Sequence, residues 1–207
     1  GMGPTPMTYF AHYHLNADAA IMVTGSHNPS EYNGFKMVLN KHSFYAEDIQ
    51  SLQKLIDQND LKLIEGEIIN QDIKKDYNER LLQNINLNKK IKIAWDIGNG
   101  AMGVVIKEII NNLNNSDNIL INEEVDGNFP NHHPDPTVPK NMEQLVKVVK
   151  DKNCDIGLAF DGDGDRLGVV DNLGNLVLAD QYMLLLCSEI TNLYDNPKII
   201  MDVKCSK

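Results

Sequence analysis

Hydrophobic and polar positions alternate in blocks along this chain of 207 residues. Short apolar runs bounded by turn residues predict buried strands, whereas apolar residues spaced three or four apart predict helices. The predicted strands are residues 19–23, 35–39, 91–97, 118–122, 156–160, 167–170 and 199–203. The predicted helices are residues 7–15, 46–58, 72–85, 101–113, 143–150 and 180–194. Strands that alternate with helices in this order indicate a mixed α/β fold, with largely parallel sheets sandwiched by helices.

An Asn- and Lys-rich run at residues 84–90 interrupts this alternation, and a fresh series of strands and helices begins after it. We therefore expect a domain boundary there, with one α/β unit in residues 1–84 and another in residues 85–196. The Leu- and Met-rich stretch at 183–186 lies on a predicted helix, and we expect it to be core packing.

The composition is that of a globular protein, with 42% hydrophobic and 23% charged residues. The formal net charge of −10 argues against a nucleic-acid partner, because no basic stripe exists to meet phosphate backbones. Cys154, Cys187 and Cys205 are far apart and show no metal-binding spacing, which predicts reduced thiols in a cytoplasmic protein. No apolar run approaches the ~18 residues of a membrane span, and no signal peptide is apparent, so we expect no membrane partner. No sequence feature specifies an oligomeric state.

Three acidic residues alternate with glycines in residues 161–166 (DGDGDR). Glycine accepts backbone angles that other residues avoid, so Asp161, Asp163 and Asp165 can converge on one point. Converged carboxylates repel one another, and a hard cation such as Mg²⁺, Mn²⁺ or Ca²⁺ removes that repulsion. The strands predicted on both sides place this loop at a strand end, where open α/β sheets carry their sites. We therefore predict a metal site rather than a solvated hairpin turn.

Arg166 at the end of this aspartate loop indicates a further anion, because a cation beside a metal ion is unfavourable on its own. A phosphate group would satisfy both positive charges. An EF-hand is excluded, since its loop requires Gly at the sixth position and Glu at the twelfth, where this chain has Arg166 and Asn172. A non-enzymatic Ca²⁺-binding module is an alternative, and it predicts no covalent phosphate.

A polar loop, residues 24–29 (TGSHNP), follows a predicted strand and exposes Ser26 as a nucleophile or phosphate carrier. The loop lacks the Gly-x-Ser-x-Gly pattern of an α/β-hydrolase. We expect His27 to contact a phosphate or substrate rather than to act as the base for Ser26, because neighbours on an extended chain face opposite sides. Lys36 follows a turn and can move protons if it is buried beside the phosphate.

A complete G-x-G-x-x-G pattern, formed by Gly98, Gly100 and Gly103, lies between a predicted strand and a predicted helix. This context is typical of a dinucleotide-binding module. However, Asp96 would repel a pyrophosphate, and such a module leaves the aspartate and serine loops unexplained. We therefore expect a tight packing turn.

A long loop at residues 126–141 contains His132, His133 and Asp135, which offer a candidate zinc site. Adjacent histidines rarely converge on one ion, so we expect a structural role for them. A loop of this length is seldom idle in a compact domain.

These motifs together resemble the α-D-phosphohexomutase family, in its bacterial phosphomannomutase/phosphoglucomutase branch. The serine loop with residues 32–36 (YNGFK) is similar to the active-site serine loop of that family, and residues 161–166 are similar to its metal loop. Residues 126–137 resemble a loop of its second domain, and short stretches at 4–6 and 203–206 match further landmarks. The resemblance spans nearly the whole chain and preserves the order of the motifs.

The resemblance implies a phosphoserine at Ser26, whose phosphate would share one Mg²⁺ with Asp161, Asp163 and Asp165. Three carboxylates, Mg²⁺, an arginine and a phosphate leave a modest negative balance. Phosphoryl transfer depends mainly on positioning and charge stabilisation, which these groups can supply.

The implied enzyme is a phosphomannomutase/phosphoglucomutase, an intramolecular phosphotransferase of the isomerase class. It would interconvert the sugar phosphates hexose 1-phosphate and hexose 6-phosphate, with hexose 1,6-bisphosphate as intermediate and activator. Arg166 would hold phosphoserine oxygens, and Lys36 and His27 would assist proton transfer. Phosphoglucosamine mutase is the alternative within the family, because the sequence does not fix the sugar.

Members of the family have four domains. The resemblance assigns residues 1–84 to the end of domain 1, residues 85–196 to domain 2 and residues 197–207 to the start of domain 3. It places the sugar-recognition loop of domain 3 and the phosphate clamp of domain 4 outside these residues. We therefore expect the 207-residue chain to be inactive as a mutase on its own.

Overall fold

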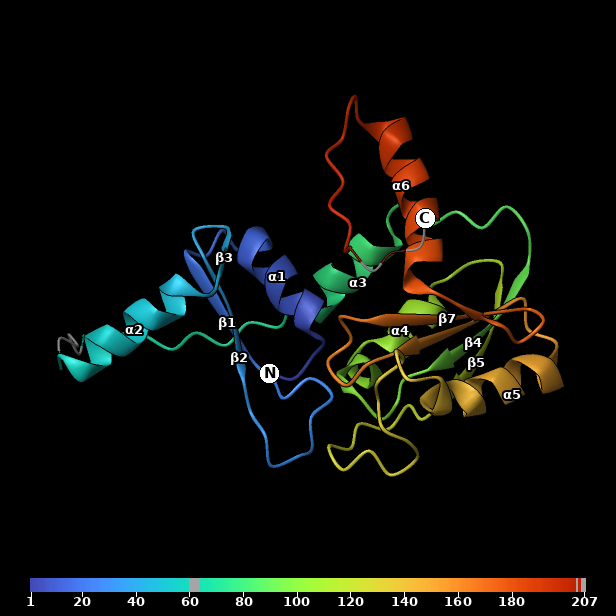
Figure 1. The fold of residues 1–207 in the computed structure, drawn as a ribbon, viewed down its shortest axis with the longest axis horizontal. Coiled ribbons are helices and arrows are strands. Elements are labelled where there is room, and N and C mark those ends of the chain that lie inside the picture. Colours follow the sequence, from blue (N-terminus) through green and yellow to red (C-terminus); the bar gives the residue numbers. More distant parts are fainter. Residues whose placement is uncertain (60–63, 204, 206–207) are drawn as a thin grey trace.

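The computed structural model describes residues 1–59, 64–203 and 205, and it contains two sheets with helices around them (Figure 1). The helices are α1 (Thr5–His14), α2 (Glu47–Asp57), α3 (Lys74–Leu82), α4 (Ile106–Asn111), α5 (Glu143–Lys152) and α6 (Ala179–Leu193), with short 3₁₀ helices η1 (Ala101–Val104) and η2 (Pro139–Met142). The strands are β1 (Ala19–Val23), β2 (Phe35–Leu39), β3 (His42–Phe44), β4 (Ile91–Asp96), β5 (Ser116–Ile121), β6 (Ile156–Phe160), β7 (Leu167–Asp171) and β8 (Leu176–Val177). This architecture confirms the predicted mixed α/β class. Lys204 and Ser206, which belong to the stretch at 203–206, lie outside the described residues.

The first sheet carries the serine loop and has the order β1-β2-β3, with both strand pairs antiparallel. In the part of the chain that the structure describes, this first sheet has no parallel pair, because one loop joins β1 to β2 and reverses the direction of the chain. Helix α1 packs on β1 and has a proline in its first turn, where the missing N–H costs nothing. Helix α2 extends away from the sheet (Figure 1). We call α1, α2 and β1–β3 the first unit.

The second sheet has the order β5-β4-β6-β7-β8. Strand β4 pairs in parallel with β5 and β6, while the β6-β7 and β7-β8 pairs are antiparallel. Strand β5 follows β4 in the chain and lies on one side of it, whereas β6 comes next and lies on the other side of β4. The direction in which strands are added to the sheet therefore reverses at β4. Open α/β sheets bind ligands at the carboxyl ends of strands beside such a reversal. The aspartate loop follows β6 and therefore lies at this edge.

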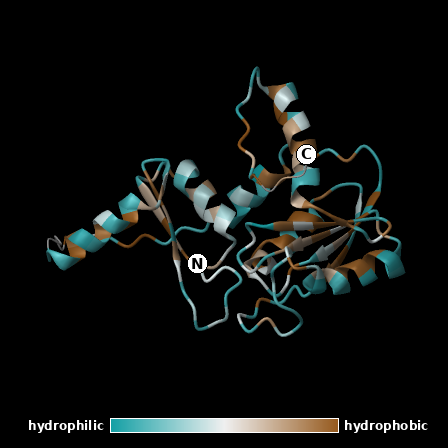
Figure 2. Cartoon of the chain, viewed as in Figure 1, coloured by the Kyte–Doolittle hydropathy of each residue, from teal (hydrophilic) through white to brown (hydrophobic). Residues whose placement is uncertain are grey.

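Helices cover both faces of the second sheet and bury two hydrophobic clusters. Side chains of β4 alternate between them, because Ile93 and Trp95 lie in the cluster under α4 and Ala94 lies in the cluster under α5. Figure 2 shows hydrophobic residues concentrated on these strands. Tyr77 of α3 also belongs to the cluster under α4, and α3 itself contacts α4 and α1. We call β4–β8, α4 and α5 the second unit.

The predicted strand at 199–203 is absent, since these residues have no regular secondary structure. A strand needs hydrogen bonds from a neighbour, and within the described ranges no strand pairs with this segment. Ile200 and Val203 are almost fully exposed. The predicted helix at 101–113 is divided into η1 and α4.

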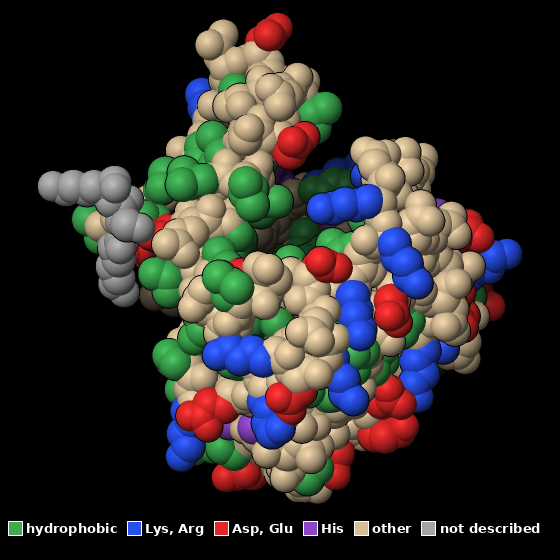
Figure 3. Space-filling view, turned by 90° about the vertical axis from the view of Figure 1, so that its right-hand side faces the viewer, with side chains coloured by type: hydrophobic (Ala, Val, Ile, Leu, Met, Phe, Trp, Pro, Cys, Tyr) green, Lys and Arg blue, Asp and Glu red, His purple; other side chains and the backbone are tan. Residues whose placement is uncertain are grey.

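The prediction of core packing for residues 183–186 is also wrong. Leu184, Leu185 and Leu186 are each more than half exposed on α6. Figure 3 shows hydrophobic side chains gathered on the projecting part of the molecule that contains this helix. The helical period was correct, but the sequence did not reveal what packs on its apolar side. Within the described part of the chain, no helix is long and apolar enough to cross a membrane.

Candidate active site

The aspartate loop connects β6 to β7 and curls around the carboxylate of Asp161. The Oδ1 atom of Asp161 accepts hydrogen bonds from the backbone N–H groups of Asp165 and Arg166, both at 3.0 Å. Gly164 has a φ of 72°, a left-handed conformation that glycine adopts at low cost, and this lets the loop close. The Asp161 side chain is fully buried, and its Oδ2 atom is left to face Ser26.

Asp163 is held by side chains from the first unit. Its Oδ2 atom accepts hydrogen bonds from Thr5 Oγ1 at 2.6 Å, Lys36 Nζ at 2.7 Å and Thr24 Oγ1 at 3.2 Å. The backbone N–H of Thr5 also donates to the carbonyl oxygen of Asp163 at 2.8 Å. The Asp163 side chain is only 3% exposed, and its Oδ1 atom is left to face Ser26.

Ser26 lies on the loop between β1 and β2 and contacts both buried carboxylates. Its Oγ atom is 3.2 Å from Asp161 Oδ2 and 3.2 Å from Asp163 Oδ1. Its φ is 56°, and its backbone N–H donates to Thr24 Oγ1 at 2.8 Å. A side chain on Gly162 would overlap the carbonyl oxygen of Ser26, so the serine and aspartate loops approach as closely as glycine allows. The structure thus brings together residues far apart in sequence.

His27 lies beside the Ser26 hydroxyl, contrary to our expectation. Its Nδ1 atom is 3.2 Å from Ser26 Oγ, within hydrogen-bond distance. The expectation assumed an extended chain, but the positive φ of Ser26 turns the backbone and brings the two side chains together. His27 Nε2 is 3.8 Å from the Asp135 carboxylate, and its ring meets that of His133 edge-on. The argument that adjacency places His27 badly as a base is therefore wrong.

Lys36 on β2 reaches from the first unit to two aspartates. Its Nζ atom is 2.7 Å from Asp163 Oδ2 and 2.5 Å from Asp165 Oδ2. Partial burial lowers the pKa of Lys36, but hydrogen bonds to both carboxylates outweigh burial and raise the pKa above its ordinary value. The ammonium therefore offsets part of the negative charge that the aspartates concentrate.

Arg166 lies at the rim of the site. Its side chain is 46% exposed, and its Nε atom is 3.9 Å from Asp161 Oδ2. The carboxylate of Asp135 lies nearby, and burial alone would raise its pKa. Hydrogen bonds from Thr137 outweigh this effect, and the charges of His27 and Arg166 add to theirs, so the pKa of Asp135 is lowered. The exposed guanidinium is accessible to an anion that approaches from solvent.

The three aspartates have different electrostatic environments. Burial raises the pKa of Asp161, and the neighbouring carboxylates of Asp163 and Asp165 raise it further. Burial also opposes ionisation of Asp163, but hydrogen bonds from Lys36 and Thr5 prevail and hold its pKa below the ordinary value. One oxygen from each aspartate lies within 4.8 Å of the others. Ligand sets made up only of carboxylate oxygens suit hard divalent cations, so these three aspartates fit such an ion.

Thr5 and Asp135 contact residues of the site, and the sequence did not predict either contact. Thr5 is 158 positions from Asp163, and no spacing rule connects two residues so far apart. Its one signal was its place in the Pro-Thr-Pro stretch at 4–6. Asp135 was considered only as a zinc ligand, because the contact with His27 depends on how the two units meet.

The glycine pattern at residues 98–103 is a packing turn. A side chain on Gly100 would lie 2.7 Å from the carbonyl oxygen of Gly162, and one on Gly103 would overlap the carbonyl oxygen of Glu123. Protein backbone therefore fills the space that a pyrophosphate would need. The dinucleotide-binding alternative is not supported.

The two adjacent histidines of the loop at 126–141 point to different partners. His132 Nε2 is 2.9 Å from Asp96 Oδ2, whereas His133 contacts the ring of His27. The hydrogen bond to Asp96 raises the pKa of His132, although burial opposes the shift. The pair therefore does not converge on one ion. Among the described residues, the group of acidic side chains that could hold a metal ion together is Asp161, Asp163 and Asp165 of the aspartate loop.

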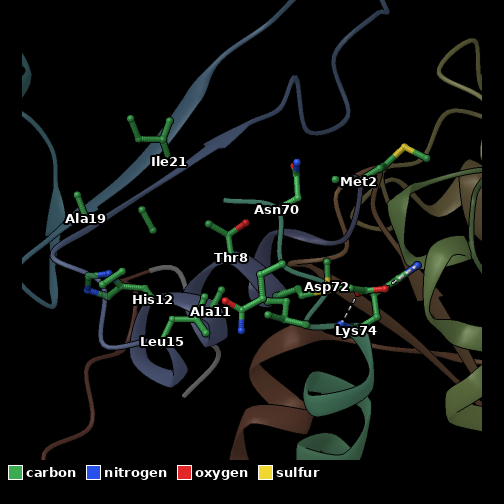
Figure 4. Close-up of a pocket in the computed structure, with 16 residues that line it drawn as sticks. Met2, Thr8, Ala11, His12, Leu15, Ala19, Ile21, Asn70, Asp72 and Lys74 are labelled. Atoms are coloured by element: carbon green, nitrogen blue, oxygen red, sulfur yellow. Dashed lines mark hydrogen bonds and ion pairs between the residues drawn. The ribbon is translucent and has the colours of Figure 1, made fainter. Parts of the chain in front are cut away.

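Two cavities of similar size open on the first unit. One of about 750 Å³ lies beside Ser26 and Asp163. The other, of about 740 Å³, lies between α1, β1 and residues 70–74, and Figure 4 shows Thr8 and Ile21 among its lining residues. None of the predicted site residues lines this second cavity. The convergence of carboxylates, rather than cavity size, therefore identifies the site.

Comparison with known proteins places this combination of fold and site in one family. The family model described as phosphoglucomutase/phosphomannomutase, alpha/beta/alpha domain I, matches residues 1–62, and the model for alpha/beta/alpha domain II matches residues 75–174. The chain belongs to the phosphoglucomutase/phosphomannomutase family of α-D-phosphohexomutases.

Individual relatives are similar over the whole chain. It is 44% identical over 207 residues to a phosphomannomutase/phosphoglucomutase from Pseudomonas putida, a match that covers 100% of this chain and 44% of the relative. It is 40% identical over 209 residues to a phosphoglucomutase from Neisseria gonorrhoeae, covering 100% of this chain and 45% of the relative. A crystal structure of a family protein from Burkholderia thailandensis matches with a TM-score of 0.87 and 38% identity, covering 93% of this chain and 44% of that one. The chain thus spans less than half the length of these relatives.

Proposed function

We propose that this chain supplies the serine and metal loops of a phosphomannomutase/phosphoglucomutase, an intramolecular phosphotransferase of the isomerase class. The enzyme interconverts hexose 1-phosphate and hexose 6-phosphate through a phosphoserine and hexose 1,6-bisphosphate. The observation that carries the proposal is the position of Ser26 Oγ, 3.2 Å from a carboxylate oxygen of Asp161 and of Asp163. The names of the relatives support these substrates over the phosphoglucosamine mutase alternative.

Mg²⁺ is the cation that we assign to the aspartate loop, one per site. Asp161, Asp163 and Asp165 each offer an oxygen for it, and a phosphate on Ser26 offers another. When bound, the cation neutralises charge that develops on the transferring phosphoryl group. The support is the donor set, because a cluster of carboxylate oxygens without nitrogen or sulfur suits hard cations such as Mg²⁺ better than Zn²⁺ or Cu²⁺.

Two phosphoryl transfers account for the reaction. In the first, the C6 hydroxyl of hexose 1-phosphate attacks the phosphorus on Ser26. The new O–P bond forms, the bond to Oγ breaks, and the hydroxyl proton passes to a base. In the second, Ser26 Oγ attacks the phosphorus atom of the phosphate group on C1. The bond between that phosphorus and the sugar oxygen breaks, and the sugar oxygen takes up a proton. The products are hexose 6-phosphate and a regenerated phosphoserine.

Three charged or titratable side chains are assigned roles in these transfers. His27 and Lys36 assist the proton movements, and the support is that His27 Nδ1 is 3.2 Å from Ser26 Oγ while Lys36 Nζ lies among the aspartates. Arg166 holds oxygens of the phosphoserine, and the support is its exposed guanidinium at the rim of the same loop.

We also propose the domain division and the setting of the enzyme. Residues 1–84 form the end of domain 1, residues 85–196 form domain 2, and residues 197–207 begin domain 3. The support is that each of the first two ranges contains its own sheet. The substrate is a small sugar phosphate rather than a nucleic acid, in keeping with the net charge of −10, and we place the reaction in the cytoplasm.

Mass spectrometry tests the proposed covalent step. The whole enzyme that contains this chain is incubated with Mg²⁺ and glucose 1,6-bisphosphate, and its intact and peptide masses are measured. We expect one added phosphate group, located on Ser26, that excess hexose monophosphate removes. Ser26→Ala should gain none, whereas Ser43→Ala, on the exposed strand β3, should be phosphorylated like the unsubstituted protein. A protein that never carries phosphate on Ser26 would refute the proposal.

A further inference from the structure

Thr5 is a buried polar residue to which the proposed reaction assigns no role. It is the first residue of α1 and is 0% exposed. Its hydroxyl donates to Asp163 Oδ2 at 2.6 Å, and its backbone N–H donates to the carbonyl oxygen of Asp163 at 2.8 Å. Two hydrogen bonds therefore join the start of the first helix to the aspartate loop.

Asp163 can present either carboxylate oxygen to Ser26, and the surrounding donors decide which one it presents. The donors other than Ser26, namely Thr5, Thr24 and Lys36, all bind Oδ2, which leaves Oδ1 at 3.2 Å from Ser26 Oγ. The two oxygens of Asp161 differ in the same way, because backbone N–H groups bind its Oδ1 while its Oδ2 faces Ser26. Each carboxylate thus has one anchored oxygen and one directed at the serine.

Among the donors to Asp163, Thr5 is best placed to hold this orientation. The Lys36 side chain is 30% exposed and can rearrange. The bond from Thr24 is longer, at 3.2 Å, and the Thr24 hydroxyl also accepts the N–H of Ser26. The bond from Thr5 is the shortest of the three, is buried, and is fixed by the adjacent backbone bond. Hydrogen bonds to a carboxylate are stronger than those between neutral groups.

We propose that Thr5 is a positioning residue of the cation site. By holding Oδ2 of Asp163, it keeps Oδ1 directed at the place that Ser26 shares with a divalent cation. The proposal rests on the proposed function only in requiring a divalent cation at the aspartate loop. Groups that anchor a metal-ligating carboxylate typically contribute about 10- to 100-fold in metal affinity.

The test is the affinity of the protein for Mn²⁺ alone, measured by electron paramagnetic resonance of the free ion. Thr5→Val keeps the shape and the backbone N–H but removes the hydroxyl, and Thr5→Ser retains it. Thr8→Val is the matched control, because Thr8 lies on the same helix and its hydroxyl contacts Met22 Sδ at 3.3 Å instead. We expect Thr5→Val to weaken Mn²⁺ binding about tenfold or more, while Thr5→Ser and Thr8→Val stay within about twofold of the unsubstituted protein.

Thermal unfolding separates positioning from folding. We expect Thr5→Val to show a smaller upward shift of the melting temperature with Mn²⁺ than Thr8→Val shows. Affinities are measured below the melting temperature of every variant, so that folded protein is compared throughout. Unchanged affinity in Thr5→Val, equal losses in Thr5→Val and Thr5→Ser, or no Mn²⁺ binding by the unsubstituted protein would each overturn the proposal. None of these measurements requires phosphate on Ser26, so this inference and the proposed function can fail separately.

Discussion

Helices α2 and α5 both carry an amphipathic pattern, yet their apolar faces have very different surroundings. In α5, Leu145 and Val149 are completely buried against the second sheet. In α2, Leu52 and Ile56 are 37% and 61% exposed, and the helix projects away from the first sheet (Figure 1). In both cases the pattern predicts a helix and its apolar side, but it does not specify which element packs against that side.

The same difference distinguishes the two units. The second unit buries two hydrophobic clusters, whereas the buried residues within 1–59 are Gly3, Pro4, Thr5 and His12. The proposed catalytic serine therefore lies on a unit with little core of its own. Its position depends on contacts with the aspartate loop, and that loop is supported by the well-packed second sheet.

Matched Leu→Ala substitutions give the largest expected effect on this comparison. Leu145→Ala leaves a cavity between α5 and the second sheet, so we expect it to lower the free energy of unfolding by about 3 kcal/mol. Leu52→Ala removes an already exposed side chain and should cost less than about 1 kcal/mol. Urea unfolding followed by circular dichroism measures both values. Equal losses would show that the apolar face of α2 is covered in solution.

Gly162→Ala tests the contact through which the second unit positions the serine. The added methyl group would overlap the carbonyl oxygen of Ser26 and push the two loops apart. We expect phosphorylation of Ser26 by hexose 1,6-bisphosphate to slow about 100-fold, since small displacements of reacting groups have effects of this size. Gly66→Ala is the control, because nothing lies within 4 Å of its added methyl group. An unchanged rate in Gly162→Ala contradicts the role given to this contact.

The pH dependence of stability gives the smallest expected effect. The hydrogen bond to Asp96 raises the pKa of His132 above its ordinary value of 6.5. This pair therefore stabilises the second unit fully below about pH 6.5 and less as the pH rises through the raised pKa. We expect His132→Gln, a neutral donor, to cost about 1 kcal/mol at about pH 5.5 and less at about pH 9. Urea unfolding measures the difference, and a cost that grows with pH contradicts the assignment.

Local elements and motifs were predictable because they depend on neighbours in sequence. The predicted strand at 19–23 has the bounds of β1, and the aspartate loop follows a strand as expected. The strand at 199–203 failed because pairing needs a second segment, which the pattern of one segment does not specify. The position of His27 failed because the left-handed backbone of Ser26, rather than an extended one, sets the direction of the side chain.

The sequence by itself determined the α/β class, the helical and strand periods and the acidic and serine loops, since all of these follow from residue type and local spacing. Only the tertiary structure decided that Ser26 contacts Asp161 and Asp163, that Thr5 anchors Asp163, and that the apolar face of α5 is buried while that of α2 is exposed. The physical reason is that hydrogen bonds and burial depend on distances in space. Those distances are set by how two separately formed sheets meet.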